Sequence, residues 1–165
     1  KFIRFKKSSN INIKKQEYNI KIFENILDGS ENFALTKGNL KENKIPRVRV
    51  ISSDIVKNYL MGKKFPNLFN KTIDYFKNYK DCVLVFVRDP NLKSVSETLI
   101  GYKSKKYYNK GQDKLIKNYG IGAQIIKALH IKKMILVTRS KKKVVGLDGY
   151  GIKITKQEII RWKFV

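Results

Sequence analysis

The residue types that most often do chemistry in proteins are scarce in this chain. Its 165 residues include one cysteine, Cys82, and one histidine, His130. A zinc site built from cysteine and histidine needs three or four such ligands, so the count excludes a thiolate zinc centre. A single cysteine also excludes a disulfide within the chain, which suits a reducing compartment, and we expect a cytoplasmic protein.

These two residues and a pair of glycines have simple structural interpretations. Cys82 begins an apolar run and is interpreted as a small core residue. His130 follows a helical pattern, and with no nucleophile or acid partner visible a left-handed helix cap is the favoured interpretation. Gly120 and Gly122 form a GxG pattern that could shape a phosphate loop, but inside a helix-forming stretch close packing is favoured.

The chain is strongly basic, with 37 Lys or Arg, 13 Asp or Glu and a net charge of +24. Such a charge attracts nucleic acid, anionic lipid or phosphorylated ligands. Proteins that read nucleic-acid sequence favour arginine, whereas here lysine dominates and Ile, Asn and Tyr are abundant, as in AT-rich genomes. Two interpretations therefore stay open: codon bias, and a surface selected for polyanions.

The apolar pattern predicts the elements that position these groups. Alternating or continuous apolar residues predict strands over 18–23, 32–37, 47–52 and 82–87, preceded over 1–15 by an edge strand or a loosely held arm. In the strand 47–52, the alternation places Val48 and Val50 on one face and Arg47, Arg49 and Ile51 on the other.

Two helices are predicted between and after these strands. One spans 68–79 and buries Phe69, Ile73 and Phe76. The other spans 116–130, and its apolar face is Ile116, Tyr119, Ala123, Ile126 and Leu129.

Strands over 134–137 and 152–154 follow the second helix, and 93–113 is expected to be a mobile, basic connection. Strands that alternate with helices predict an α/β fold with a mixed β-sheet flanked by helices. The length favours a single domain, 1–165. No run of 18 apolar residues and no leader pattern is present, so we expect no membrane partner. Because Lys1 replaces the usual Met, we expect a fragment or a processed chain.

Several segments resemble the GTP cyclohydrolase II family, the enzymes that open the GTP ring at the first step of riboflavin synthesis. The matching segments are 119–125 (YGIGAQI), 137–138 (VT), 143–151 (KVVGLDGYG) and 22–39. They stand in the order and spacing of that family. The resemblance therefore implies a GTP cyclohydrolase II-like fold over nearly the whole chain.

The resemblance also implies that the family's chemical groups are missing. The three zinc cysteines of the family correspond to Asp54, Phe65 and Asn67, so zinc is predicted to be absent. The acid and arginine pair that acts on the substrate corresponds to Leu115 and Lys117. No catalytic residue is therefore predicted.

What the resemblance leaves is one end of the substrate pocket. Arg49, Arg88, Thr138 and Lys143 match positions that face or flank the GTP phosphates, which predicts a residual phosphate or nucleotide site. The alternative is that Arg49 lies on a solvated strand face and that 141–143 is a solvated basic loop.

The leading hypothesis is a catalytically degenerate riboflavin-biosynthesis domain. It looks like the zinc-less C-terminal domains fused to 3,4-dihydroxy-2-butanone 4-phosphate synthase in alphaproteobacteria. We expect it to bind a phosphorylated small molecule or to support that synthase, and a homodimer is compatible with this role.

Two alternatives remain. One is a basic RNA-binding component of a ribonucleoprotein assembly, because 101–143 holds 13 Lys or Arg and one acid, interleaved with tyrosines. The other is an active GTP cyclohydrolase with a rebuilt site.

Overall fold

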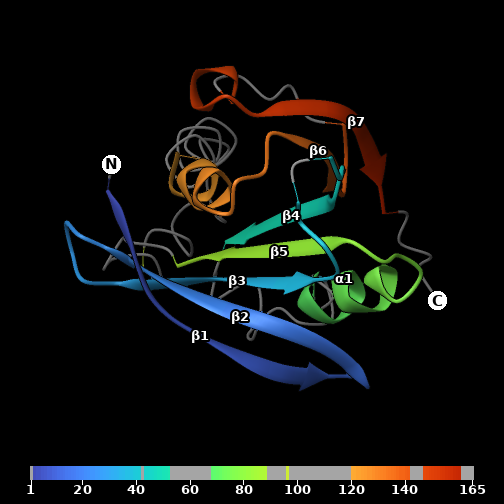
Figure 1. Ribbon diagram of the computed structural model, residues 1–165, viewed down its shortest axis with the longest axis horizontal. Coiled ribbons are helices and arrows are strands. Elements are labelled where there is room, and N and C mark those ends of the chain that lie inside the picture. The colour runs from blue at the N-terminus through green and yellow to red at the C-terminus, as the bar shows by residue number, and fades with distance from the viewer. Residues whose placement is uncertain are drawn as a thin grey trace.

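The computed structural model describes residues 2–41, 43–52, 68–88, 96, 120–141 and 147–160. Its centre is one seven-stranded sheet in the order β1-β2-β3-β5-β4-β6-β7 (Figure 1). The strands are β1 (Ile3–Ile13), β2 (Gln16–Asn25), β3 (Glu31–Lys37), β4 (Arg47–Ser52), β5 (Cys82–Val87), β6 (Lys133–Thr138) and β7 (Lys153–Ile159). The sheet is mixed, as predicted.

The strand directions divide the sheet into two parts. Strands β1, β2 and β3 form an antiparallel meander, and β3 pairs antiparallel with β5. Strand β4 pairs in parallel with β5 on one side and β6 on the other, and β6 pairs in parallel with β7. The carboxyl ends of β4, β5, β6 and β7 therefore meet at one edge of the sheet.

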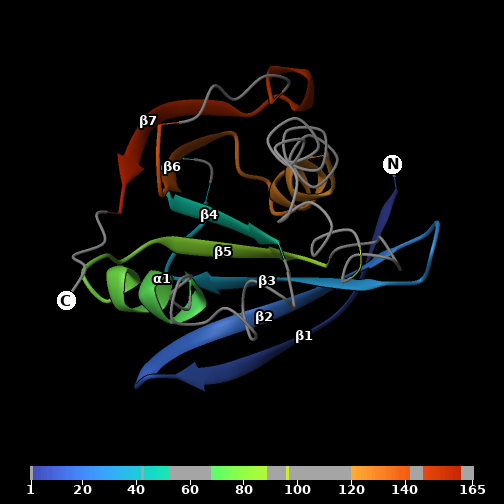
Figure 2. The ribbon, with the colours of Figure 1, turned by 180° about the vertical axis from the view of Figure 1, so that it is seen from behind.

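A helix covers each face of the sheet, and the two helices appear well apart in both views of the ribbon (Figure 1 and Figure 2). Helix α1 (Leu68–Phe76) buries Ile73 and Phe76 against Leu35 and Leu84, on what we call the α1 face. The helical residues 120–128 pack on the opposite face, which we call the 120–128 face. Its core residues include Ala123, Ile125, Ile126, Val83, Val85, Met134 and Leu136. None of the helices in the described ranges is long and apolar enough to span a membrane.

The predicted alternation of β4 is confirmed. Val48 and Val50 belong to the cluster on the 120–128 face, whereas Ile51 belongs to the cluster on the α1 face. Because side chains alternate along a strand, Arg47 and Arg49 lie on the α1 face with Ile51.

Gly122 serves close packing, as predicted. A Cβ atom at this position would lie 3.2 Å from Cγ1 of Val50, so the missing side chain lets the helix approach β4. Gly120 has no neighbour within 4 Å of such an atom.

The structural interpretations of the histidine and the cysteine are also confirmed. His130 has φ 60°, in the left-handed region, and its backbone N–H donates to the Lys127 carbonyl at 3.0 Å. Cys82 is fully buried, and burial raises the pKa of its thiol to about 11.

Several elements differ in extent from the prediction, and strand β2 (Gln16–Asn25) is longer at both ends than the predicted 18–23. The first residues form the full edge strand β1, which pairs with β2 along its length, so the loosely held arm is wrong. Strand β7 continues five residues beyond the predicted end at Ile154, where its residues are mainly polar and apolar periodicity is lost. Helix α1 ends at Phe76, because Lys37 Nζ binds the Phe76 carbonyl at 2.6 Å and the next three amides bond to carbonyls three residues back. The predicted connection 93–113 lies outside the described residues, apart from residue 96.

A polar cluster fastens β4, β7 and α1 together on the α1 face. Arg47 Nε donates to Glu158 Oε1 at 2.6 Å, and the Tyr75 hydroxyl donates to the same oxygen at 2.9 Å. The Arg47 guanidinium also lies 3.6 Å from the centre of the Tyr79 ring. Burial alone would raise the pKa of Glu158, but the hydrogen bonds from Arg47 and Tyr75 outweigh it and hold that pKa below its usual value of 4.5.

The lowered pKa predicts that Glu158 contributes stability that acid removes. This contribution is complete above pH 4.5, the pKa in the unfolded chain, and is lost as the pH falls through the lower folded pKa. We expect Glu158→Gln to lower the free energy of unfolding by about 1 to 3 kcal/mol at neutral pH, because it leaves Arg47 without its carboxylate. The loss should shrink toward pH 3. Urea unfolding of both proteins across this range measures it.

Glu17→Gln is the matched control, since Glu17 is an exposed carboxylate on β2. It should change stability little at any pH. Parallel pH profiles for wild type and Glu158→Gln would contradict the assignment.

The cap at His130 generates a second prediction. Because His130 is exposed and left-handed, His130→Gly should raise the free energy of unfolding by about 0.5 to 1 kcal/mol, since it removes the steric cost of a Cβ there. Chemical denaturation checks this. His130→Ala keeps the Cβ and should give no gain, and a less stable glycine variant would disprove the argument.

Candidate functional site

The carboxyl edge of the parallel strands has the topology of a ligand site. In chain order, strand β4, which ends at Ser52, is followed by α1 on one face, and its neighbour β5, which ends at Val87, is followed by the helical residues 120–128 on the other face. Adjacent parallel strands whose connections leave to opposite faces form a topological switch point. Open α/β sheets generally bind ligands outside the strand ends at such a point.

Arg88 follows β5 at this switch point, with an exposed side chain. Its backbone N–H donates to Oδ1 of Asn32 at 2.7 Å, and Asn32 is only 1% exposed. The pKa of Asp28 is lowered chiefly by hydrogen bonds from Ser30, and Arg88 adds to this effect from nearby. The structure therefore places Arg88 at the predicted edge, beside the turn between β2 and β3.

Thr138 ends β6 at the same edge and is 3% exposed. Its hydroxyl is buried and has no hydrogen-bond partner among the described residues, although its carbonyl accepts the Ile160 N–H at 2.8 Å. A buried hydroxyl without a partner is uncommon in folded proteins.

Arg49 is buried, with 6% exposure, so the alternative of a solvated strand face is wrong. Its Nη1 donates to the Val137 carbonyl at 3.2 Å, which ties β4 to β6. The parallel register pairs Val48 with Leu136, so Arg49 leaves the sheet on the α1 face and Thr138 on the 120–128 face. The structure does not bring these two side chains together on one face. Lys143 lies outside the described residues, and the neighbouring Lys141 is exposed.

The positions that correspond to the family's zinc ligands, Asp54, Phe65 and Asn67, and to its acid and arginine pair, Leu115 and Lys117, lie outside the described residues, so the predicted absence of zinc stays a prediction. Cys82 is the first residue of β5, and His130 precedes β6, so both lie toward the amino ends of the parallel strands. A six-residue strand separates the two edges by about 16 Å. Across the ranges that the structure describes, no group of three or more His, Cys, Asp and Glu side chains is arranged to hold a metal ion.

Sequence reasoning missed Asn32. Its side chain holds the backbone of Arg88 from 56 positions away, across the β3–β5 pair, and its Nδ2 has no hydrogen-bond partner within the described part of the chain. The local sequence contains no sign of this contact, which the antiparallel register alone creates.

Comparisons with known proteins agree with this architecture. The family model described as GTP cyclohydrolase II matches residues 4–158. The chain is 30% identical to the monofunctional riboflavin biosynthesis protein RIBA 2, chloroplastic, of Arabidopsis thaliana, over 81% of this chain and 29% of that protein. It is 28% identical to the riboflavin biosynthesis protein RibBA of Aquifex aeolicus, over 87% of this chain and 38% of that protein. The chain thus spans only about a third of these relatives.

A solved structure has the same fold. It is the crystal structure of RibBX, a two-domain 3,4-dihydroxy-2-butanone 4-phosphate synthase from A. baumannii, and the likeness has a TM-score of 0.62 at 18% identity. It covers 98% of this chain and 41% of that one, and it shows the fold alone. Because the family model matches almost the whole length of this chain, the chain belongs to the GTP cyclohydrolase II family.

Proposed function

We propose that this domain binds a phosphorylated small molecule or nucleotide and no longer performs the ring-opening chemistry of its family. The observation that carries the proposal is the switch point between β4 and β5, where Arg88 is exposed and the buried Thr138 hydroxyl lies two strands away. An arginine fork and a hydroxyl suit a phosphate group.

Each residue has a distinct role in this proposal. Arg88 supplies the charge and the paired donors to the phosphate, and Thr138 donates a neutral hydrogen bond. Arg49 supports the site indirectly, because its hydrogen bond to the Val137 carbonyl holds the end of β6 next to β4. Lys143 follows the end of β6 by five residues in the sequence and adds charge.

The loss of catalysis is inferred from the residue types at the family's chemical positions. Asp54, Phe65 and Asn67 replace three thiolates, and a phenylalanine cannot ligate a metal. Leu115 replaces an acid and has no proton to exchange. The chain therefore lacks the ligands that would hold a metal to activate water, and it lacks the acid that would transfer a proton.

The relatives suggest the setting in which such binding would matter. Proteins that share this domain are named for riboflavin biosynthesis, and the solved structure is a two-domain synthase. We infer that the domain supports an attached or associated 3,4-dihydroxy-2-butanone 4-phosphate synthase, through ligand binding or through assembly.

Titration calorimetry with GTP, ribulose 5-phosphate and inorganic pyrophosphate at low and high ionic strength tests the ligand site. We expect one of these to bind in high salt. Arg88→Gln should weaken that binding by about 10- to 100-fold, because one charge-assisted contact is lost. Thr138→Val should weaken it by roughly five- to tenfold at nearly unchanged side-chain volume.

Lys41→Gln removes the same charge at an exposed turn and should leave binding unchanged. Equal weakening by Lys41→Gln, or binding only at low salt, would contradict a specific site. Release of formate from GTP by the purified protein would disprove the loss of catalysis.

A further inference from the structure

Two lysines lie directly opposite each other at the amino ends of β6 and β7. The parallel register pairs Lys133 with Lys153, and both side chains are exposed. Neighbouring strands are about 4.8 Å apart, so the two ammonium groups repel each other. Neither lysine takes part in an ion pair with any described residue. An anion between the two side chains would offset this repulsion.

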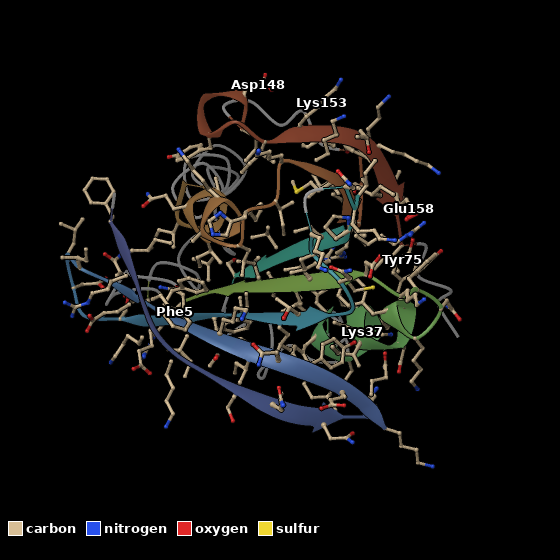
Figure 3. The ribbon with its side chains drawn as sticks, viewed as in Figure 1. Phe5, Lys37, Tyr75, Asp148, Lys153 and Glu158 are labelled. Carbon is tan, nitrogen blue, oxygen red and sulfur yellow. The ribbon has the colours of Figure 1, made fainter. Side chains whose placement is uncertain are left out.

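A third lysine extends this pair along the same face. Lys156 pairs with Ile135, two residues after Lys133, so its side chain also leaves the sheet on the α1 face. Strand β7 is the outer strand of the sheet, and Figure 3 shows Lys153 on it above Glu158. We call Lys133, Lys153 and Lys156 the lysine row.

Within the described part of the chain, Glu158 is the one acid that forms an ion pair with a member of the lysine row. Asp148 and Glu158 are the only acids between positions 120 and 160. Glu158 is engaged by Arg47 and Tyr75 and lies 3.9 Å from Lys156, at the edge of ion-pair distance (Figure 3). The row therefore keeps an excess of positive charge. Codon bias is one interpretation of the number of lysines, but it does not account for three lysines on one exposed face of two adjacent strands.

We propose that the lysine row binds the phosphate backbone of single-stranded RNA. A line of lysines contacts successive phosphates as point charges and needs no base reading, which suits lysine in place of arginine. Beside the row, the stacked Arg47 and Tyr79 offer a planar, cationic surface next to which a base can lie. Ile154 packs against the core on the 120–128 face, and Thr155, the other residue between Lys153 and Lys156, is polar. The row lies toward the amino ends of the parallel strands, so it is separate from the ligand site at their carboxyl ends.

Fluorescence anisotropy with a labelled oligouridylate of about 15 nucleotides, titrated at several salt concentrations, tests the proposal. The test variant is Lys133→Gln, Lys153→Gln, Lys156→Gln. Each phosphate contact to a single strand contributes about 0.7 to the slope of log affinity against log salt, so this variant should lose about 2 from the slope. Its affinity near physiological salt should fall by at least about tenfold.

The matched control is Lys7→Gln, Lys15→Gln, Lys21→Gln, which removes the same charge from the β1–β2 hairpin at the opposite edge of the sheet. It should retain affinity within about twofold. Arg88→Gln should also retain RNA binding, which separates this surface from the proposed ligand site.

The melting temperature without RNA shows whether the test variant folds. Because the repulsion between Lys133 and Lys153 is removed, the variant should melt about 1 to 3 °C higher than wild type at low salt. Equal loss of RNA affinity in the test and control variants would overturn the proposal. So would binding of phosphatidylserine vesicles with no binding of RNA.

Discussion

The parallel pairing of β4 on both sides is the constraint on which the rest of the structure depends. A strand with neighbours on both edges and a helix over each face is buried, yet β4 carries Arg47 and Arg49 on its α1 face. Burying a guanidinium is costly unless a partner offsets the lost hydration. Arg47 finds Glu158 of β7 and Arg49 finds the Val137 carbonyl of β6. The two arginines thus fasten the C-terminal strands to the centre of the sheet.

The same centre carries the ligand site that we propose. In chain order β4 is followed by α1 and β5 by the helical residues 120–128, and these two helices lie on opposite faces of the sheet. Backbone topology depends on packing and not on catalytic side chains, so the proposed phosphate site does not require the family's catalytic groups.

The positions of the basic residues in the structure distinguish their roles, which the amino-acid composition alone cannot do. The net charge of +24 is compatible with codon bias. Some basic residues have evident structural partners: Lys37 binds the end of α1, and Lys6 pairs with Glu31. Lys133 and Lys153 differ, because the register sets them against each other. Like charges directly opposite each other are unfavourable, and the RNA binding that we propose would offset their repulsion.

The sequence by itself determined the elements and their faces. Local periodicity and residue size predicted four features: the alternation of β4, the core position of Cys82, the packing role of Gly122 and the left-handed backbone of His130. Of the predicted phosphate residues, it located Arg88 and Thr138 at one edge of the sheet. Only the tertiary structure decided that Arg49 and Thr138 leave opposite faces, that Asn32 holds Arg88, and that Glu158 holds Arg47. These contacts join residues far apart in the chain, and strand register sets them, which no local pattern encodes.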